Sequence, residues 1–167
     1  MKIICLLCVF LLLTGCGTVP VWETVDDFMP TIPTSTWLDE AYAIQLGLPE
    51  HAKLTWQTDT CCLYEAETIE IMTETFLASD LNTAVRHLSG YEAENLLILE
   101  TTRFDLPEYQ FAWYTQTAEG GSLCRADLVM DGSTCYSVVC TSPEGENTMD
   151  TIRQVFSTFG LSDREMV

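Results

Sequence analysis

The sequence predicts an α+β domain in which two amphipathic helices pack on an antiparallel β-sheet meander. Two segments repeat apolar residues with the helical period, and the segments between them have the composition or the alternation of strands. Turn signals that contain glycine, proline and aspartate separate these strands at short intervals. Strands that follow one another between isolated helices indicate the α+β class. No internal repeat is evident in the sequence.

The first predicted helix covers about residues 80–89. Ser79 is a favoured N-cap residue, and Gly90 is a typical C-terminal stop. The apolar residues of this segment follow the i, i+3, i+4, i+7 spacing, which places them on one face of a helix. These residues are Leu81, Ala84, Val85 and Leu88.

The second predicted helix covers about residues 148–159. Asn147 is expected to cap it, and Asp150 lies in the first turn, where the helix dipole favours an acidic side chain. Gly160 ends the helix. Its apolar stripe consists of Met149, Ile152, Val155, Phe156 and Phe159.

Four strands are expected between these helices, at residues 95–104, 108–117, 123–130 and 134–141. The first of them is rich in aliphatic residues, so we expect its beginning to be covered on both faces. The last two should form a hairpin, because Asp131-Gly132 is a strong turn signal. Four earlier segments also have strand character. They are residues 42–46, 53–57, 60–65 and 68–76.

Three of these features together resemble the PsbP-like fold of small exported domains and lipoproteins. They are the helix that begins with residues 80–85, the antiparallel meander, and the strand at residues 136–139 that leads to residues 152–159. The resemblance covers most of residues 42–161. It implies a protein of binding or assembly and supplies no catalytic residues. Function does not follow from a fold alone.

The N-terminus has the features of a cleaved export signal. Lys2 precedes eleven apolar residues, 3–13, and the chain continues with small residues. Leu13-Thr14-Gly15-Cys16 resembles the lipobox of bacterial lipoproteins. That resemblance implies a diacylglycerol on the sulfur of Cys16, acyl chains such as palmitate, and cleavage just before this residue. The alternative is an ordinary secretory signal.

The expected organisation is therefore a signal peptide at residues 1–15, a lipidated N-terminus and flexible tether at 16–36, and one domain at 37–167. Prolines at positions 20, 30 and 33 disfavour helix and central strand in the tether. The apolar run is shorter than the roughly 20 residues that a membrane helix needs. We expect the protein to be anchored on the outer face of the cell membrane, or at the outer membrane if a cell has two.

The chain is strongly acidic. It has 25 acidic and 7 basic residues and a formal net charge of −18. Loss of residues 1–15 removes one basic residue, Lys2, and no acid, which gives −19 for the mature chain. Such a charge repels nucleic acid and anionic headgroups, so the lipid must hold the protein at the membrane. The acids are scattered, which is typical of a solvated surface.

Five cysteines follow the lipobox, an odd number that leaves at least one thiol unpaired within the chain. A three-residue loop at 131–133 would place Cys124 opposite Cys140, with Cα atoms about 4.5–5.5 Å apart and suited to a disulfide. A two-residue loop would instead place Cys124 opposite Val139. The other alternative is that all five are small buried residues. They are Cys61, Cys62, Cys124, Cys135 and Cys140.

One strand carries three aromatic residues at alternate positions, Tyr109, Phe111 and Trp113. Alternation places them on one side of the sheet. Most such stripes form the core under a helix, and an open stripe would instead be a groove for a peptide, glycan or lipid. This face is the candidate ligand face of the sequence.

No catalytic motif is present. The sequence lacks G-x-S-x-G and the phosphate-binding G-x-x-x-x-G-K. Of its two histidines, His87 is expected at the edge of the buried stripe of the first helix, and His51 has no predictable partner. No two of the five cysteines have the C-x-x-C spacing of zinc sites. We therefore expect no enzyme, no metal and no cofactor.

The sequence thus favours a non-catalytic lipoprotein that binds or scaffolds an extracytoplasmic protein or peptide, and no nucleic acid. A solute- or peptide-binding receptor component is the alternative, although such receptors usually need two lobes and a longer chain. An exported hydrolase is the third hypothesis, and the missing motifs count against it.

Overall fold

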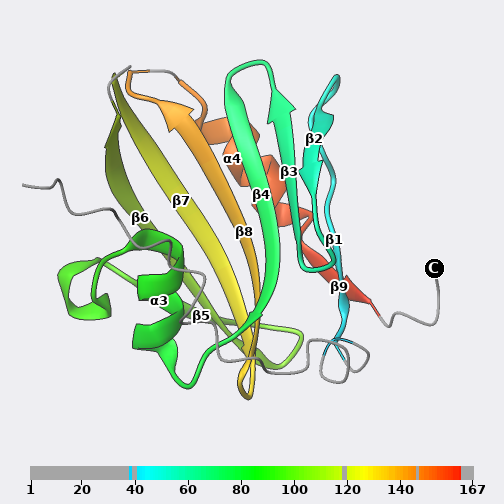
Figure 1. The fold of residues 1–167 in the computed structure, drawn as a ribbon, viewed down its shortest axis with the longest axis vertical. Helices are drawn as coiled ribbons and strands as arrows, with labels where there is room; N and C mark the ends of the chain where they lie inside the picture. The colour runs from blue at the N-terminus through cyan, green and yellow to red at the C-terminus, as the bar shows by residue number, and fades with distance from the viewer. Residues whose placement is uncertain (1–37, 39–40, 118–119, 146, 163–167) are drawn as a thin grey trace, which may run out of the picture. The chain divides into compact units, whose positions relative to one another are not determined.

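The computed structural model describes residues 38, 41–117, 120–145 and 147–162 (Figure 1). The predicted signal peptide, Cys16 and the whole of the predicted tether at residues 16–36 lie outside these residues. In chain order the elements are β1 (Ala43–Gln45), β2 (Lys53–Gln57), β3 (Cys61–Ala66), β4 (Ile69–Leu77), α3 (Leu81–Ser89), the 3-10 helix η2 (Ala93–Asn95), β5 (Leu99–Arg103), β6 (Leu106–Thr117), β7 (Gly120–Asp131), β8 (Thr134–Pro143), α4 (Met149–Ser157) and β9 (Gly160–Ser162).

Seven of the strands form one antiparallel sheet in the order β2-β3-β4-β8-β7-β6-β5. The predicted single meander is therefore incorrect. Two meanders, β2-β3-β4 and β5-β6-β7-β8, join where β4 pairs with β8. The reason is that α3 and η2 carry the chain from β4 across the sheet to its far edge, where β5 begins (Figure 1). The architecture is α+β, as predicted, with the sheet dominant.

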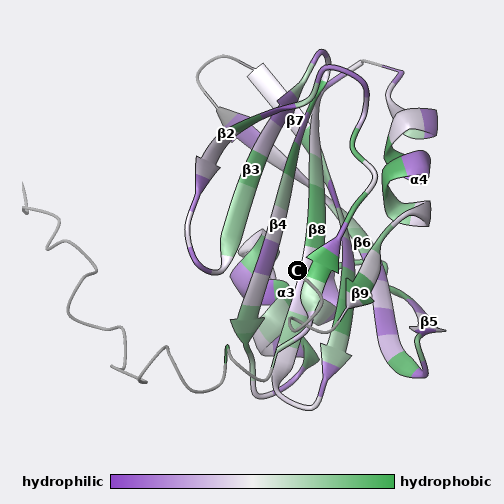
Figure 2. Ribbon diagram, turned by 90° about the vertical axis from the view of Figure 1, so that its right-hand side faces the viewer, coloured by the Kyte–Doolittle hydropathy of each residue, from purple (hydrophilic) through white to green (hydrophobic). Residues whose placement is uncertain are grey.

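The two helices cover opposite faces of this sheet (Figure 2). Neighbouring strand residues point to opposite faces, so Leu128 packs in the core under α3 and Val129 packs in the core under α4. Ala84 and Val85 of α3 and Ile152 and Val155 of α4 are fully or almost fully buried. We call the two sides of the sheet the α3 face and the α4 face.

A second, two-stranded sheet lies beside α4. It pairs β1 with β9 in antiparallel register, with Ala43 opposite Ser162 and Gln45 opposite Gly160. Ile44 of β1 and Leu161 of β9 pack against the same core as α4. The strand β9 was not predicted, because three residues are too few to show an alternating pattern.

The capping residues differ from the prediction by one position at each helix. Asp80, not Ser79, is the N-cap of α3, and its carboxylate accepts a hydrogen bond from the backbone N–H of Thr83 at 2.8 Å. Gly90 ends α3 in the left-handed conformation, as predicted. Thr148 occupies the N-cap position of α4 and makes no capping bond with its side chain.

The strand predicted at residues 95–104 is also shorter than expected. Its first residues form part of η2 and a connection, and β5 begins only at Leu99. Leu96 and Ile98 pack against the core of the α3 face without entering the sheet, while β5 itself is largely exposed. β5 is the edge strand of the sheet and is largely exposed, so the predicted coverage of both faces is wrong.

Candidate functional site

The aromatic stripe of β6 lies in the core under α3. Phe111 and Trp113 are 5% and 6% exposed, their ring centroids are 5.6 Å apart, and Tyr109 packs against the same cluster. Ala84 and Val85 of α3 belong to that cluster. The stripe is therefore the packed interior of the α3 face, and it offers no open groove for a ligand.

All five cysteines of the described chain are free thiols, and the proposed Cys124–Cys140 bridge is incompatible with the register of β7 and β8. Asp131 pairs with Thr134, so the loop consists of Gly132 and Ser133 and places Cys124 opposite Thr141. Cys124 then lies on the α3 face, whereas Cys140 lies on the α4 face. Both predicted loops began at Asp131, one residue earlier than the observed loop. A shift of one residue in strand register moves a side chain to the other face.

The buried thiols are poor nucleophiles. Burial, with Glu74 and Cys62 as lesser causes, raises the pKa of Cys61 to about 11. Burial likewise raises the pKa of Cys135 and the pKa of Cys140 to about 12. Nucleophilic attack needs the thiolate, so these three groups are unsuited to covalent catalysis near neutral pH.

A small cavity lies between the two sheets, on the α4 face. It has a volume of about 370 Å³, and we call it the interlayer slot. β1 and the residues after it form one wall with Ile44, Leu46 and Leu48. β3, β4 and the β2–β3 turn form the floor and the opposite wall. The residues on this side are Gln57, Thr58, Asp59, Thr60, Cys61, Cys62, Tyr64, Thr73 and Thr75.

The slot is apolar on one side and rich in hydroxyl groups on the other. Thr73 and Thr75 of β4 are only 8% and 7% exposed as whole residues and line the slot, but neither hydroxyl is among the buried side-chain atoms that lack a partner. The two hydroxyls are therefore polar groups that a ligand in the slot can reach. Asp59 is the one charged residue among the slot's lining residues. The lining therefore favours an uncharged ligand that offers both an apolar surface and hydrogen-bonding groups.

A larger and more open pocket lies at the end of the sheet where β2 begins and β8 ends. It has a volume of about 680 Å³. His51 and Lys53 face acidic residues there, and the hydroxyls of Ser122 and Ser142 contribute to the lining. The acidic residues are Glu65, Glu67 and Glu70. Because charges of both signs line an open surface, this pocket selects no ligand class, and the slot is the better candidate.

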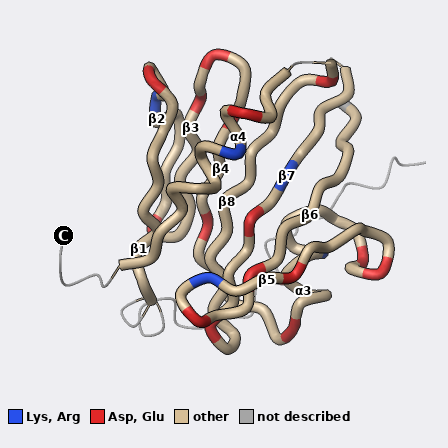
Figure 3. The backbone as a smooth tube through the Cα atoms, turned by 180° about the vertical axis from the view of Figure 1, so that it is seen from behind, with Lys and Arg blue, Asp and Glu red and all other residues tan. Residues whose placement is uncertain are grey.

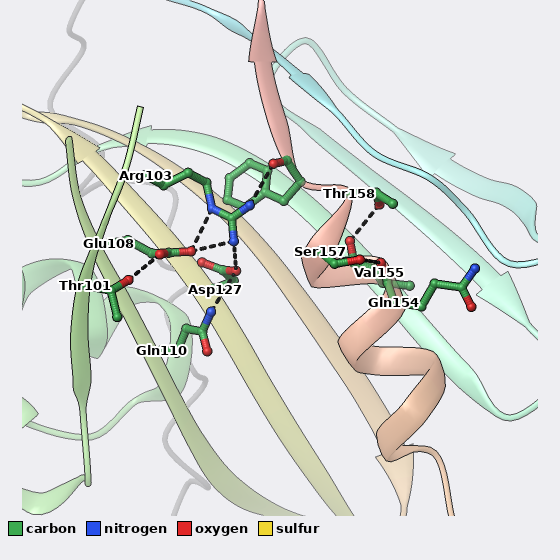
Figure 4. A network of polar contacts seen from close by, with 10 residues as sticks. Thr101, Arg103, Glu108, Gln110, Asp127, Gln154, Val155, Ser157 and Thr158 are labelled. Atoms are coloured by element: carbon green, nitrogen blue, oxygen red, sulfur yellow. Dashed lines mark hydrogen bonds and ion pairs between the residues drawn. The ribbon is translucent and has the colours of Figure 1, made fainter. Parts of the chain in front are cut away.

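A network of buried charges connects β5, β6 and β7 on the α4 face (Figure 4). Arg103 lies 2.6 Å from Glu108 and 3.2 Å from Asp127, and it donates a hydrogen bond to the carbonyl oxygen of Phe159 at 2.9 Å. The guanidinium also lies 5.4 Å from the centre of the Phe159 ring. Arg103 thereby ties the edge of the main sheet to the junction of α4 and β9.

Asp127 is fully buried, and its two carboxyl oxygens differ. Oδ2 accepts hydrogen bonds from Arg103 and from the side-chain amide of Gln110, each at 3.2 Å, whereas Oδ1 has no donor among the described residues. Burial, followed by the charge of Glu108, raises the pKa of Asp127 to about 7. A buried carboxyl oxygen without a donor favours the protonated group, which can then donate to Glu108.

The pKa of Glu108 is shifted in the opposite direction, downward. Burial alone raises the pKa of its carboxyl, but hydrogen bonds from Thr101 and Arg103 outweigh burial and hold the pKa below the ordinary value. The pair therefore consists of an ionised Glu108 beside a carboxyl that is neutral below about pH 7. Its bonds all run within the chain, so the network organises the fold and exposes no reactive group.

The two histidines of the chain lie at separate places in the fold. His87 of α3 is 3.1 Å from the Glu74 carboxylate, and this hydrogen bond raises the pKa of His87. Its ring is also 4.3 Å from the Phe76 ring, which indicates packing at the edge of the core. His51 lies in the end pocket with a positive φ of 67°. Among the described residues, no group of three His, Cys, Asp or Glu side chains is arranged to hold a metal ion.

Sequence reasoning missed both the slot and the charge network. Thr73 and Thr75 lie at alternate positions of β4 and so share one face of the strand, which is a detectable signal, but nothing local shows that β1 lies opposite them. Arg103, Glu108 and Asp127 come from three strands, and each of them is one charge among many in the sequence. Only the strand order brings them together.

No protein-family model matches the chain, and a search of curated proteins finds no significant match. A similar solved structure is a protein from Bacteroides thetaiotaomicron VPI-5482, with a TM-score of 0.51 and 10% identity. The likeness covers 73% of this chain and 46% of that protein, so this chain spans less than half of its length. At such an identity the likeness shows the fold alone.

Two other solved structures are similar at lower scores. One is a mutant of Mog1, with a TM-score of 0.49 and 13% identity over 74% of this chain and 93% of that chain. The other is LpqN, which is involved in cell envelope biogenesis of Mycobacterium tuberculosis, with a TM-score of 0.49 and 11% identity over 73% of this chain and 84% of that chain. Their scores lie below 0.5, and the function proposed below does not rest on them.

Proposed function

We propose that this protein is an extracytoplasmic lipoprotein whose domain binds a small uncharged ligand in the interlayer slot and performs no catalysis. Residues 1–15 would be the signal peptide and Cys16 the lipidated residue, with residues 16–36 as the tether to the domain at 37–167. The observation that carries the binding role is the lining of the slot, in which the threonines Thr73 and Thr75 lie opposite the apolar side chains of Ile44, Leu46 and Leu48.

The ligand class follows from the lining of the slot. A volume of about 370 Å³ suits a small molecule or a short part of a chain, within the range of roughly 300–1,000 Å³ that is usual for such sites. Ile44, Leu46 and Leu48 would contact an apolar surface of the ligand, while the threonine hydroxyls would bond to its hydroxyl or amide groups. Neutral saccharides and dipeptides with uncharged side chains and blocked termini have this combination of groups.

The proposed absence of catalysis has its own support. The thiols of Cys61, Cys135 and Cys140 have raised pKa values, and the charge network around Asp127 is buried. His87 pairs with Glu74 away from the slot. A covalent mechanism would need a nucleophile beside a base in an accessible site.

The slot can be tested with a panel of neutral di- and trisaccharides and N-acetylated dipeptide amides with uncharged side chains, with binding measured by saturation-transfer NMR on the full-length protein in detergent. Thr73→Val and Thr75→Val remove the two hydroxyls and keep the side-chain shape. We expect each change to weaken binding about fivefold, because a hydrogen bond contributes about 1 kcal/mol.

Thr55→Val is the matched control, since Thr55 is exposed on β2, donates its hydroxyl to the Leu63 carbonyl oxygen and lies outside the slot. It should leave binding unchanged. The binding role is refuted if no member of the panel binds saturably, or if the two slot variants bind as strongly as Thr55→Val.

A further inference from the structure

One long strand of the main sheet has an open edge. β6 has 12 residues, but its neighbour β5 pairs only with residues 106–110, from Leu99 opposite Gln110 to Arg103 opposite Leu106. Beyond Gln110, β6 continues to Thr117 and pairs with β7 alone. No described strand lies on the other side of residues 111–117, a segment that we call the open edge (Figure 1).

The backbone at the open edge points outward at alternate residues. The phenol of Tyr91 donates a hydrogen bond to the carbonyl oxygen of Tyr114 at 3.4 Å. This bond shows that the Tyr114 carbonyl faces away from β7. The N–H and C=O groups of one strand residue point the same way, and successive residues alternate. Ala112 and Gln116 therefore also present their backbone groups outward, ready to pair with an added strand.

The open edge lacks the features that normally protect an edge. Its sequence, Phe-Ala-Trp-Tyr-Thr-Gln-Thr, has no charge, no proline and no glycine. The opposite edge strand, β2, has Lys53 and a register shift between Leu54 and Trp56. Charges and bulges of this kind prevent edge-to-edge pairing, so their absence on β6 distinguishes it from β2.

Exposed apolar side chains flank the open edge. Leu97 is 93% exposed and Leu99 is 58% exposed, just before and at the start of the β5 segment that pairs with β6. Tyr114 and Tyr91, whose hydrogen bond links them across the edge, are 52% and 45% exposed. An added strand would cover part of this surface while its backbone pairs with β6.

The charge of the chain indicates which strand would bind. Glu94 and Glu100 are exposed on the segment beside the edge, and the whole chain has a net charge of −18. Acidic residues are spread over many elements in Figure 3, whereas basic ones are few. A second copy of this chain would bring the same negative charge and be repelled, whereas a basic segment would be attracted.

We propose that the open edge of β6 binds an extended, basic segment of a partner protein, which adds to the main sheet as an antiparallel or parallel strand. The site is separate from the interlayer slot, which lies on β1, β3 and β4. The slot can therefore fail its test while the edge passes, and the reverse also holds.

The probe is a fluorescein-labelled peptide of alternating valine and threonine flanked by lysines, with binding to the full-length protein measured by fluorescence anisotropy. Gln116→Pro removes an outward N–H without touching the bonds to β7, and we expect it to weaken binding at least about tenfold. Gln116→Ala, which keeps the N–H, should bind like the wild type. A peptide N-methylated at alternate residues should not bind.

Tyr114→Lys is a second variant that does not alter the backbone, since this side chain is half exposed and a lysine would protect the edge. It should also weaken binding, and circular dichroism checks that both variants fold. The proposal is wrong if the peptide fails to bind, if both variants bind as well as the wild type, or if glutamates in place of the lysines do not weaken binding. Self-association through this edge, abolished by Gln116→Pro, would also contradict it.

Discussion

Asp127 is a carboxyl group removed from water. It is fully buried, and its pKa of about 7 means that the folded protein retains a proton up to neutral pH. The unfolded chain releases this proton near the ordinary value of 3.8. The stabilising contribution of the proton is thus complete below 3.8 and disappears as the pH rises through about 7.

We predict that Asp127→Asn makes stability less dependent on pH. Asparagine cannot ionise and can still donate to Glu108, as the protonated aspartate does. Between pH 5 and pH 7 the wild type should lose on the order of 3 kcal/mol through this residue, since one pKa unit corresponds to about 1.4 kcal/mol. Urea unfolding at pH 5 and pH 8 measures the effect.

At pH 8 the variant should be the more stable of the two proteins, and at pH 5 they should be similar. His87 also has a raised pKa and contributes a loss of stability with rising pH, but it is present in both proteins and cancels in the comparison. Equal pH dependence in the two proteins would show that Asp127 is not held neutral in the fold.

Cys62 is the one cysteine of the described chain that is not buried, and it lines the slot. We predict that a maleimide labels this thiol first in the native protein, because the other four are shielded. Mass spectrometry of peptides identifies the labelled site, and Cys62→Ser is the control that should lose the label. Rapid labelling of Cys124 or Cys140 instead would contradict the burial of the β7–β8 core.

Among the elements, the β7–β8 hairpin depends on its two-residue loop. Gly132 has a φ of 61°, a conformation that other residues adopt at a cost of about 1–2 kcal/mol. A glycine at the first loop position matches the turn that joins closely paired strands. We predict that Gly132→Ala lowers the free energy of unfolding by about 1 kcal/mol, as measured by urea denaturation.

The matched control for the hairpin is Ser133→Ala, at the second loop position, where φ is not positive. This change should cost less than Gly132→Ala. If both variants unfold like the wild type, the loop does not fix the register, and the separation of Cys124 from Cys140 would lose its explanation.

The elements that local sequence specifies were the ones predicted well. α3 and α4 begin and end within about two residues of the expected bounds, because periodicity and glycine stops are local signals. The pairing of β4 with β8 was not predicted, since it joins Glu70 to Thr141 across a long stretch of chain. The slot and the Arg103 network both depend on such distant pairings, so neither was visible in the sequence.

At the scale of the whole molecule, the fold supplies two binding surfaces that differ in kind. We propose that the slot between the sheets binds a small neutral ligand and that the open edge of β6 binds an extended basic segment. No helix among the described residues is long and apolar enough to cross a membrane. Our proposal assigns attachment to a membrane to Cys16.

That assignment gives the last prediction. In bacteria that express the protein, labelled palmitate should be incorporated into the wild type, and Cys16→Ala should abolish the incorporation because the thioether cannot form. Stable attachment needs more than one acyl chain, and a buried methylene contributes about 0.8 kcal/mol, so the variant should leave the membrane fraction. Cys8→Ala, within the apolar run, is the matched control and should leave labelling unchanged. Label that persists in Cys16→Ala would refute the lipoprotein assignment, and both binding surfaces would then act in free solution.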